Sequence, residues 1–176
     1  MAKRTCDILI AFIAIIIFIF PCFFIAVLIL HTSSRPVIYW SKRVGSNGNF
    51  FMMPKFRTMQ VHTPEIATDK LSDPTKYLIP IGSFLRRTSI DELPQFFSVL
   101  IGDMSLVGPR PALYNQYDII SKRKVLGIDS LKPGITGWAQ INGRDHLSIQ
   151  KKNNLDYEYL KKQSIFFDFE IILKSI

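Results

Sequence analysis

Residues 8–30 read ILIAFIAIIIFIFPCFFIAVLIL and carry no charged side chain. As a helix, these 23 residues would extend roughly 35 Å, and the apolar core of a bilayer is about 30 Å thick. A cleaved signal peptide fits poorly, because the run is too long and no small-residue cleavage site follows it. The sequence therefore predicts a membrane helix at 1–34 and one membrane-associated domain at 35–176.

Pro21 lies in the middle of this run, where a proline kinks or breaks a helix. Basic residues that would meet anionic headgroups flank the run on both sides: Lys3, Arg4, Arg35, Lys42 and Arg43. The positive-inside tendency favours the cytoplasm for both groups. A straight span satisfies only one group, whereas a helix that turns back at Pro21 satisfies both. These residues alone leave a spanning and a re-entrant helix equally open.

The formal net charge of +8 over 176 residues suits nucleic acid, an anionic membrane or a phosphate-bearing substrate. The chain has no basic face interleaved with aromatic residues and no nucleic-acid reader motif, so no nucleic-acid partner is expected. Both cysteines, Cys6 and Cys22, lie in or beside the apolar run. The domain therefore has no disulfide framework, which suits a reducing cytoplasm.

The domain is expected to be a helix-rich α/β fold with a small β-hairpin and amphipathic interfacial helices. Residues 37–39 and 50–52 are β-prone, and Asn47-Gly48 between them favours a hairpin, with Pro54 ending the second strand. A further helix is expected over 114–126, and one or two amphipathic helices over 148–176. Residues 132–144 are interpreted as a glycine-rich loop.

Two adjacent carboxylates, Asp91 and Glu92, are the first candidates for chemistry. Ser89 and Glu92 fit a capping box, which would place both acids in the first turn of a helix. The helix dipole would then keep the carboxylates ionised, and a carboxylate with a low pKa can attack phosphorus or bind Mg²⁺. Acids in a first helical turn are also routine capping residues, so this pattern alone favours the structural interpretation.

Several cations could bind the phosphates of a substrate. Arg86 lies one turn before the acids, and Arg110 is held between the prolines of Gly108-Pro109-Arg110-Pro111, which restrict its backbone. Lys55 and Arg57 alternate, so a strand would place both on one face. Four residues of the 132–144 loop could also contact a ligand: Trp138, Gln140, Asn142 and Arg144.

Five segments, in this order and spacing, resemble the small monotopic phosphoglycosyl transferases, a family of bacterial sugar transferases. They are the proline-broken apolar run, KFRTM at 55–59, SIDELPQ at 89–95, GDMSLVGPRP at 102–111 and KPGITGWAQINGR at 132–144. The resemblance covers essentially the whole chain. One departure is Pro54, since the family usually continues a strand there without a proline.

The resemblance implies a re-entrant helix, broken at Pro21, that enters and leaves on the cytoplasmic face of the bacterial inner membrane. It implies that Asp91 is a nucleophile, that Glu92 is its partner acid, and that the two hold Mg²⁺. Arg110 and Pro111 fall on the family's P-R-P motif. The implied donor is a UDP-sugar, with an N-acetylated hexosamine as the expected sugar, and the implied acceptor is a polyprenol phosphate such as undecaprenyl phosphate. A homodimer is left open.

The implied reaction has two steps, through an aspartyl-phosphosugar and with release of UMP, and it starts the assembly of capsule, O-antigen or glycoprotein glycans. Two alternatives remain. A membrane-bound phosphohydrolase would use the same Asp91 adduct but resolve it with water. A non-catalytic scaffold would bind anionic lipid through its basic residues.

Overall fold

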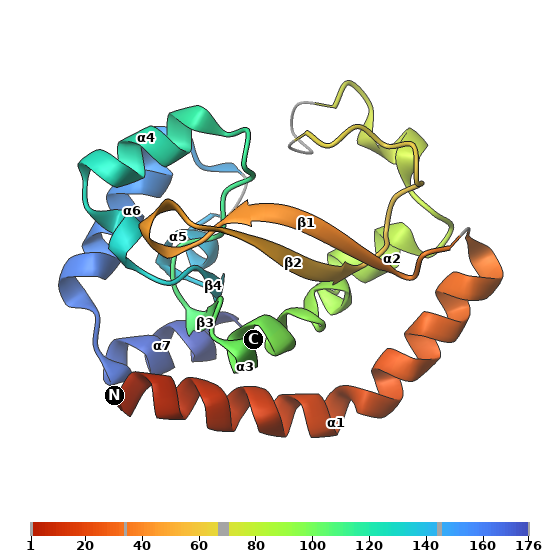
Figure 1. Ribbon diagram of the computed structural model, residues 1–176, viewed down its shortest axis with the longest axis horizontal. Helices are drawn as coiled ribbons and strands as arrows, with labels where there is room; N and C mark the ends of the chain where they lie inside the picture. The colour runs from red at the N-terminus through yellow and green to blue at the C-terminus, as the bar shows by residue number, and fades with distance from the viewer. Residues whose placement is uncertain (1, 34, 67–70, 144–145, 176) are drawn as a thin grey trace.

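The computed structural model describes residues 2–33, 35–66, 71–143 and 146–175. Helix α1 (Ala2–Thr32) runs along one side of the molecule, and the rest of the domain lies on one side of it (Figure 1). It is the one helix in these described ranges that is long and apolar enough to cross a membrane, judged by length and composition. Its run of Ile, Leu, Ala and Phe gives this helix the length and hydropathy of a membrane segment.

The predicted break at Pro21 is not present as an interruption. Helix α1 is continuous with Pro21 inside it, and Figure 1 shows it curving upward around the domain. A proline costs one backbone hydrogen bond and clashes with the preceding turn, and a long helix can absorb both by bending. The proline therefore lies within one continuous helix and does not divide it into two.

The predicted hairpin is confirmed. Strands β1 (Ile38–Val44) and β2 (Phe50–Phe56) pair antiparallel, and both turn residues, Asn47 and Gly48, have positive φ. The prediction that Pro54 ends the second strand is wrong, because β2 continues past it opposite Trp40. The Arg57 N–H donates to the Val37 carbonyl at 2.8 Å. Pro54 therefore falls at a non-hydrogen-bonded position of the ladder, where a missing N–H costs little.

The stretch 132–144 is not the predicted loop. It contains strand β4 (Gly134–Thr136), which pairs in parallel with β3 (Ser105–Val107), and the short helix α5 (Trp138–Ile141). A Cβ on Gly134 would lie 2.1 Å from the backbone nitrogen of Gly108. The glycines here allow two backbones to approach closely. In the sequence, glycines that serve close packing look the same as glycines that form a loop.

The capping box at Ser89 is also absent. Helix α2 (Gly82–Arg87) ends before Ser89, which adopts φ 56° and makes no side-chain capping bond. A 3₁₀ turn, η4 (Ile90–Glu92), follows, and helix α3 (Gln95–Ile101) begins after Pro94. The two acids therefore lie on a tight turn between two short helices.

The remaining helices agree with the predictions. Helix α4 (Tyr117–Val125) lies inside the predicted 114–126, and two helices, α6 (Ile149–Lys162) and α7 (Ile165–Ser175), occupy the C-terminal region. Short 3₁₀ turns η1 (Ser46–Gly48), η3 (Pro74–Tyr77) and η5 (Ile128–Ser130) connect other elements.

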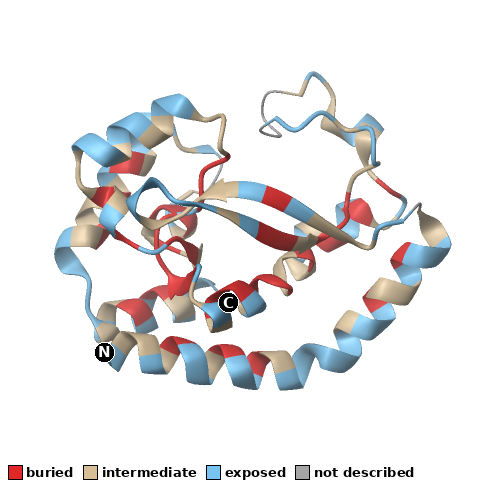
Figure 2. Cartoon of the chain, in the orientation of Figure 1, coloured by how far each residue is buried: buried red, intermediate tan, exposed pale blue. Residues whose placement is uncertain are grey.

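Two apolar clusters hold these elements together, and α1 contributes to both. Its first half places Ala11 in a cluster with Val99, Met104 and Tyr159. Its second half places Ile29 in another cluster. Figure 2 shows that much of α1 between these contacts is exposed. Both ends of the apolar helix are therefore attached to the same domain.

Candidate active site

The acidic turn η4 presents Asp91 and Glu92 beside the end of β2. Asp91 is 7% exposed. The left-handed Ser89 turns the chain after α2, and Pro94 starts α3. A turn bounded in this way has little conformational freedom, so both acids occupy defined positions.

Glu92 is held by two cations. Its Oε1 accepts a hydrogen bond from Lys55 Nζ at 2.7 Å and another from Arg110 Nη2 at 3.0 Å. Burial by itself would raise the pKa of Glu92, but Arg110 and Lys55 outweigh it and lower that pKa to about 2. Glu92 is therefore ionised and fixed in place at neutral pH.

Asp91 differs from its neighbour. Burial raises the pKa of the Asp91 carboxyl, and the charge of Glu92 raises it further, against the opposing pull of Lys55, Arg86 and Arg110. The low pKa expected from a helix N-terminus is therefore wrong, because the residue lies on a buried 3₁₀ turn. Among the described residues, none donates a hydrogen bond to the Asp91 carboxylate. A poorly solvated anion without a donor is more nucleophilic than a hydrogen-bonded one.

The loop after β3 brings Arg110 to this turn, where its guanidinium donates to Glu92. Pro109 and Pro111 on either side are buried, while the Arg110 side chain is 44% exposed. Lys55, Glu92 and Arg110 are thus joined by ion pairs next to Asp91.

Arg86 and Arg57 have mainly structural contacts. Arg86 Nε donates to Thr58 Oγ1 at 3.0 Å, and its charge still acts on Asp91. Arg57 Nε donates to the Pro36 carbonyl at 2.7 Å, and its guanidinium lies 5.8 Å from the Tyr39 ring centroid. These contacts place Arg86 near the acids and use Arg57 to close the base of the hairpin.

The predicted ligand residues of 132–144 also make internal contacts. Trp138 Nε1 donates to Glu158 Oε2 at 3.0 Å and its ring packs on Phe167. Gln140 Nε2 donates to the Ile135 carbonyl at 3.0 Å, and Asn142 Nδ2 donates to the Trp138 carbonyl at 2.8 Å. Within the part of the chain that the structure describes, the hydrogen bonds of these three side chains do not involve the acidic turn. Arg144 lies outside the described residues.

Sequence reasoning missed three residues that support the site: Arg43, Arg123 and Asp156. Arg43 was assigned to lipid headgroups, yet its Nη1 donates to the Pro111 carbonyl at 3.0 Å. Burial and the nearby Arg110 lower the pKa of Arg43 to about 10. Arg123 Nη2 pairs with Asp156 Oδ2 at 2.7 Å. No local pattern distinguishes these residues, because their partners are far away in the sequence.

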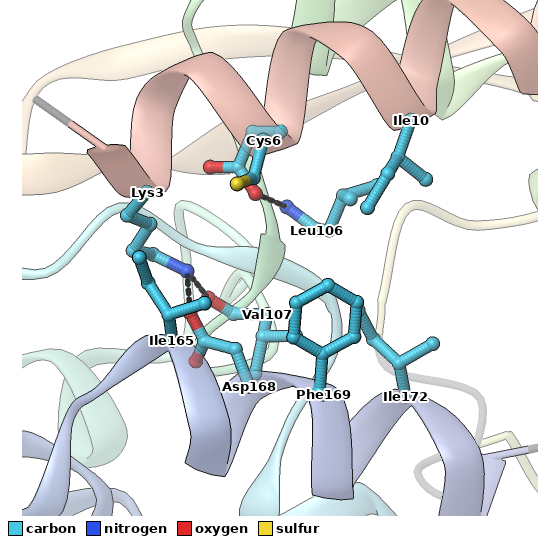
Figure 3. A pocket seen from close by; sticks show the side chains of 10 residues that line it. Lys3, Cys6, Ile10, Leu106, Val107, Ile165, Asp168, Phe169 and Ile172 are labelled. Atoms are coloured by element: carbon cyan, nitrogen blue, oxygen red, sulfur yellow. Dashed lines mark hydrogen bonds and ion pairs between the residues drawn. The ribbon is translucent and has the colours of Figure 1, made fainter.

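Lys3 and Arg4, which were predicted to meet headgroups, turn inward. Lys3 Nζ binds Asp168 Oδ2 at 2.6 Å and the Val107 carbonyl at 3.2 Å, and Arg4 Nη2 binds the Leu100 carbonyl at 2.9 Å. Figure 3 shows Lys3 and Asp168 at a small hollow between α1, β3 and α7. Its volume of about 20 Å³ suits one water molecule. The hollow is thus part of the attachment of α1 and not a substrate site.

The described residues contain no group of three or more His, Cys, Asp or Glu side chains with metal-binding geometry. Mg²⁺ needs no such group, since it commonly uses one or two carboxylates together with substrate phosphates and water. Asp91 offers a carboxylate without a donor, and Glu92 has one oxygen, Oε2, outside both ion pairs. The donor set of this turn therefore fits a hard divalent cation that arrives with a phosphate ligand.

Comparison with known proteins gives a consistent result. The family model described as bacterial sugar transferase matches residues 1–176. A galactosyl transferase, CpsE, of Streptococcus agalactiae is 39% identical over 100% of this chain and 41% of its own length. A UDP-glucose:undecaprenyl-phosphate glucose-1-phosphate transferase of Escherichia coli is 37% identical over 100% of this chain and 39% of its own length.

The exopolysaccharide production protein ExoY of Rhizobium meliloti is 33% identical over 100% of this chain and 84% of its own length. This chain thus spans about two fifths of the length of the first two relatives and most of the third.

Proposed function

The chain belongs to the bacterial sugar transferase family, and from that premise we propose that it is a phosphoglycosyl transferase. It moves a sugar 1-phosphate from a UDP-sugar to a polyprenol phosphate such as undecaprenyl phosphate. The observation that carries this proposal is the buried Asp91, to which no described residue donates a hydrogen bond, beside a Glu92 that two cations hold. The name of the Escherichia coli relative states the same class of donor and acceptor.

The proposed reaction has two displacements at phosphorus. A carboxylate oxygen of Asp91 attacks the phosphorus that carries the sugar, the bond from that phosphorus to the UMP oxygen breaks, and UMP leaves with the bonding electron pair. A phosphate oxygen of the polyprenol phosphate then attacks the same phosphorus. This second step breaks the aspartyl–phosphorus bond and regenerates the Asp91 carboxylate. Splitting the transfer lets a water-soluble donor and a lipid acceptor use one site in turn.

The cations of the site neutralise charge during both displacements. Arg110 is half exposed and beside Asp91, so its guanidinium can pair with the transferring phosphoryl group. Lys55 is more deeply placed, and it keeps Glu92 ionised and oriented. Glu92 in turn holds Arg110 in position for the substrate.

We further propose Mg²⁺ as the cofactor, held by Asp91 and by the free oxygen of Glu92. When bound, the ion would supply charge neutralisation at the diphosphate of the donor. The residues of this chain orient that diphosphate and present the carboxylate.

The attachment of α1 to the domain supports the proposed membrane arrangement. The domain binds the first turns of α1 through Lys3 and Arg4 and packs against Ile25 and Ile29 near its end. A helix with both ends on one domain cannot also place them on opposite sides of a bilayer. This supports a re-entrant helix and a catalytic domain on the cytoplasmic face of the inner membrane.

Further apolar side chains extend this lipid-contacting surface. Several exposed side chains lie on α3 and α7 next to α1: Phe97 (57%), Ile101 (74%), Phe166 (88%) and Leu173 (71%). Helices with exposed apolar side chains can bind at a membrane interface by burying those side chains among the lipids. On the family resemblance, we also propose an N-acetylated hexosamine as the sugar. The boundary between residues 34 and 35, taken from the apolar run, stays a prediction, and so does a possible homodimer.

The test is intact-protein mass spectrometry of the purified chain with Mg²⁺ and a panel of UDP-sugars, without lipid acceptor. We expect a mass increase of one phosphosugar that is absent in Asp91→Asn and present in Asp118→Asn, a matched change at an exposed acid. Polyprenol phosphate should then remove the adduct.

Other outcomes identify the alternatives. Steady release of free sugar phosphate without a lipid acceptor would indicate the phosphohydrolase. A folded protein that forms no adduct and releases no UMP, even with lipid present, would indicate the scaffold.

A further inference from the structure

The loop that carries Arg110 is fixed at four successive carbonyl groups, each by a different donor. Two donors are backbone N–H groups of β4 and β1, and two are guanidinium groups. The pairs are Pro109 O with Gly134 N (3.0 Å), Arg110 O with Arg123 Nη1 (2.8 Å), Pro111 O with Arg43 Nη1 (3.0 Å) and Ala112 O with Val44 N (3.0 Å).

Arg123 holds the carbonyl of Arg110 itself. It lies on α4, and its other amino group pairs with Asp156 on α6, which packs beside α4 (Figure 1). The side chains of this pair are only 14% and 2% exposed. The neighbours Lys122 and Lys124 are exposed, so only the middle residue of this basic run turns inward.

We infer that Arg123, anchored by Asp156, is a positioning residue that sets the Arg110 guanidinium against Glu92 and the phosphate of the substrate. The role toward the substrate phosphate rests on the proposed function, whereas the contact between Arg123 and the loop does not. The guanidinium can bind a carbonyl and a carboxylate at once because its donors form a planar fork. A lysine at position 123 could keep one of these bonds but not this geometry.

Small displacements of a phosphate-binding group have large kinetic effects, of order 10²-fold for about 1 Å. A residue that acts through Arg110 has a distinctive signature, since its effect must vanish when the Arg110 side chain is removed. A residue that only joins α4 to α6 would reduce activity by the same factor in both backgrounds.

The experiment is a double-mutant cycle on the full chain, with the UDP-sugar that labels the wild type. We expect Arg123→Lys to lower kcat/KM for the donor about 10-fold, and the matched change Lys124→Gln to leave it within about 2-fold. In an Arg110→Ala background, Arg123→Lys should have no further effect. Equal losses in both backgrounds, or no loss in the wild-type background, would overturn the inference.

Hydrogen exchange provides a readout that does not need turnover. Arg123→Lys should speed amide exchange at residues 110–113 and leave α1 unchanged, whereas Lys124→Gln should change neither. Uniform loosening of the whole domain, or unchanged exchange at 110–113, would contradict a positioning role.

Asp156→Asn tests the same contact without touching the loop, and it replaces Arg123→Lys if that variant does not fold. It should give the same local increase in exchange and the same dependence on Arg110. If the wild type forms no adduct with any donor and releases no UMP with lipid present, the proposed function fails, and hydrogen exchange alone then decides whether Arg123 positions the loop.

Discussion

Two groups of buried acids in this molecule can be compared directly. One is the acidic turn, Asp91 and Glu92. The other, called here the anchor cluster, consists of Lys3, Asp7, Asp168 and Tyr159 where α1 meets β3 and α7. In both, carboxylates with little exposure lie beside cations.

The two groups differ in whether each carboxylate oxygen has a partner. In the anchor cluster, Asp168 accepts from Tyr159 OH at 2.6 Å and from Lys3 Nζ at 2.6 Å. Asp7 accepts from Ser105 Oγ at 2.8 Å and from the Leu106 N–H at 3.2 Å. In the acidic turn, Glu92 accepts hydrogen bonds from Lys55 and Arg110, whereas no described residue donates one to Asp91.

This difference separates a structural acid from a reactive one. A fully hydrogen-bonded carboxylate stabilises the fold and is a poor nucleophile, whereas one buried without donors destabilises the fold and remains reactive. Functional sites commonly sacrifice stability in this way.

Asp91→Asn should reduce phosphosugar transfer by at least about 10³-fold, because loss of a covalent nucleophile removes the main reaction path. Turnover is measured as UMP release in the presence of Mg²⁺ and lipid acceptor. Asp168→Asn, if it still folds, should keep most of the activity per folded molecule. Comparable activity losses in the two variants would contradict the distinction between a reactive and a structural acid.

Asp168→Asn should destabilise the protein by about 3 kcal/mol, because Lys3 and Tyr159 lose the carboxylate to which they donate. The melting temperature in detergent measures this. The control is Glu170→Gln, which removes an exposed ion pair with Lys174 and should cost at most about 0.5 kcal/mol. Equal effects would show that the anchor cluster contributes no more than a surface pair.

The Glu92 ion pairs should give stability that depends on pH. The folded pKa of about 2 lies below the value of about 4.3 for an unfolded glutamate. The stabilisation is therefore fully present above about pH 4.3 and is lost as the pH falls toward 2. Wild type should lose melting temperature over this range more steeply than Glu92→Gln, and parallel curves would contradict the assignment.

Asp91→Asn should raise the melting temperature slightly at pH 7 without Mg²⁺, opposite in sign to Asp168→Asn. Since the folded pKa of Asp91 is raised, ionisation of this group destabilises the folded state above that pKa. The gain from Asn should therefore fade as the pH falls, and vanish below the unfolded aspartate pKa of about 3.9. About 1 kcal/mol would correspond to roughly 2–4 °C. A lower melting temperature at pH 7 would mean that Asp91 stabilises the fold.

Local patterns were sufficient for much of the fold. The apolar run predicted α1, Asn47-Gly48 predicted the hairpin, and the amphipathic C-terminal region predicted α6 and α7. Predictions from local patterns were wrong where one sequence signal can arise from two different structures. Gly134 and Gly137 allow close contact between backbones and do not form the predicted loop. Ser89 and Glu92 belong to a 3₁₀ turn and its start, and they do not form a capping box.

Short-range patterns among neighbouring residues were enough to predict the long apolar helix, the hairpin, the paired acids and the arginine between two prolines. Only the tertiary structure decided which cations serve the acids. Lys55 and Glu92 are 37 residues apart, and Lys3 and Asp168 are 165 apart. A charge in the sequence does not specify its partner, because pairing depends on where the packed elements bring each side chain. For that reason Arg43 and Lys3, which resembled headgroup-binding residues, instead hold the loop and the helix in place.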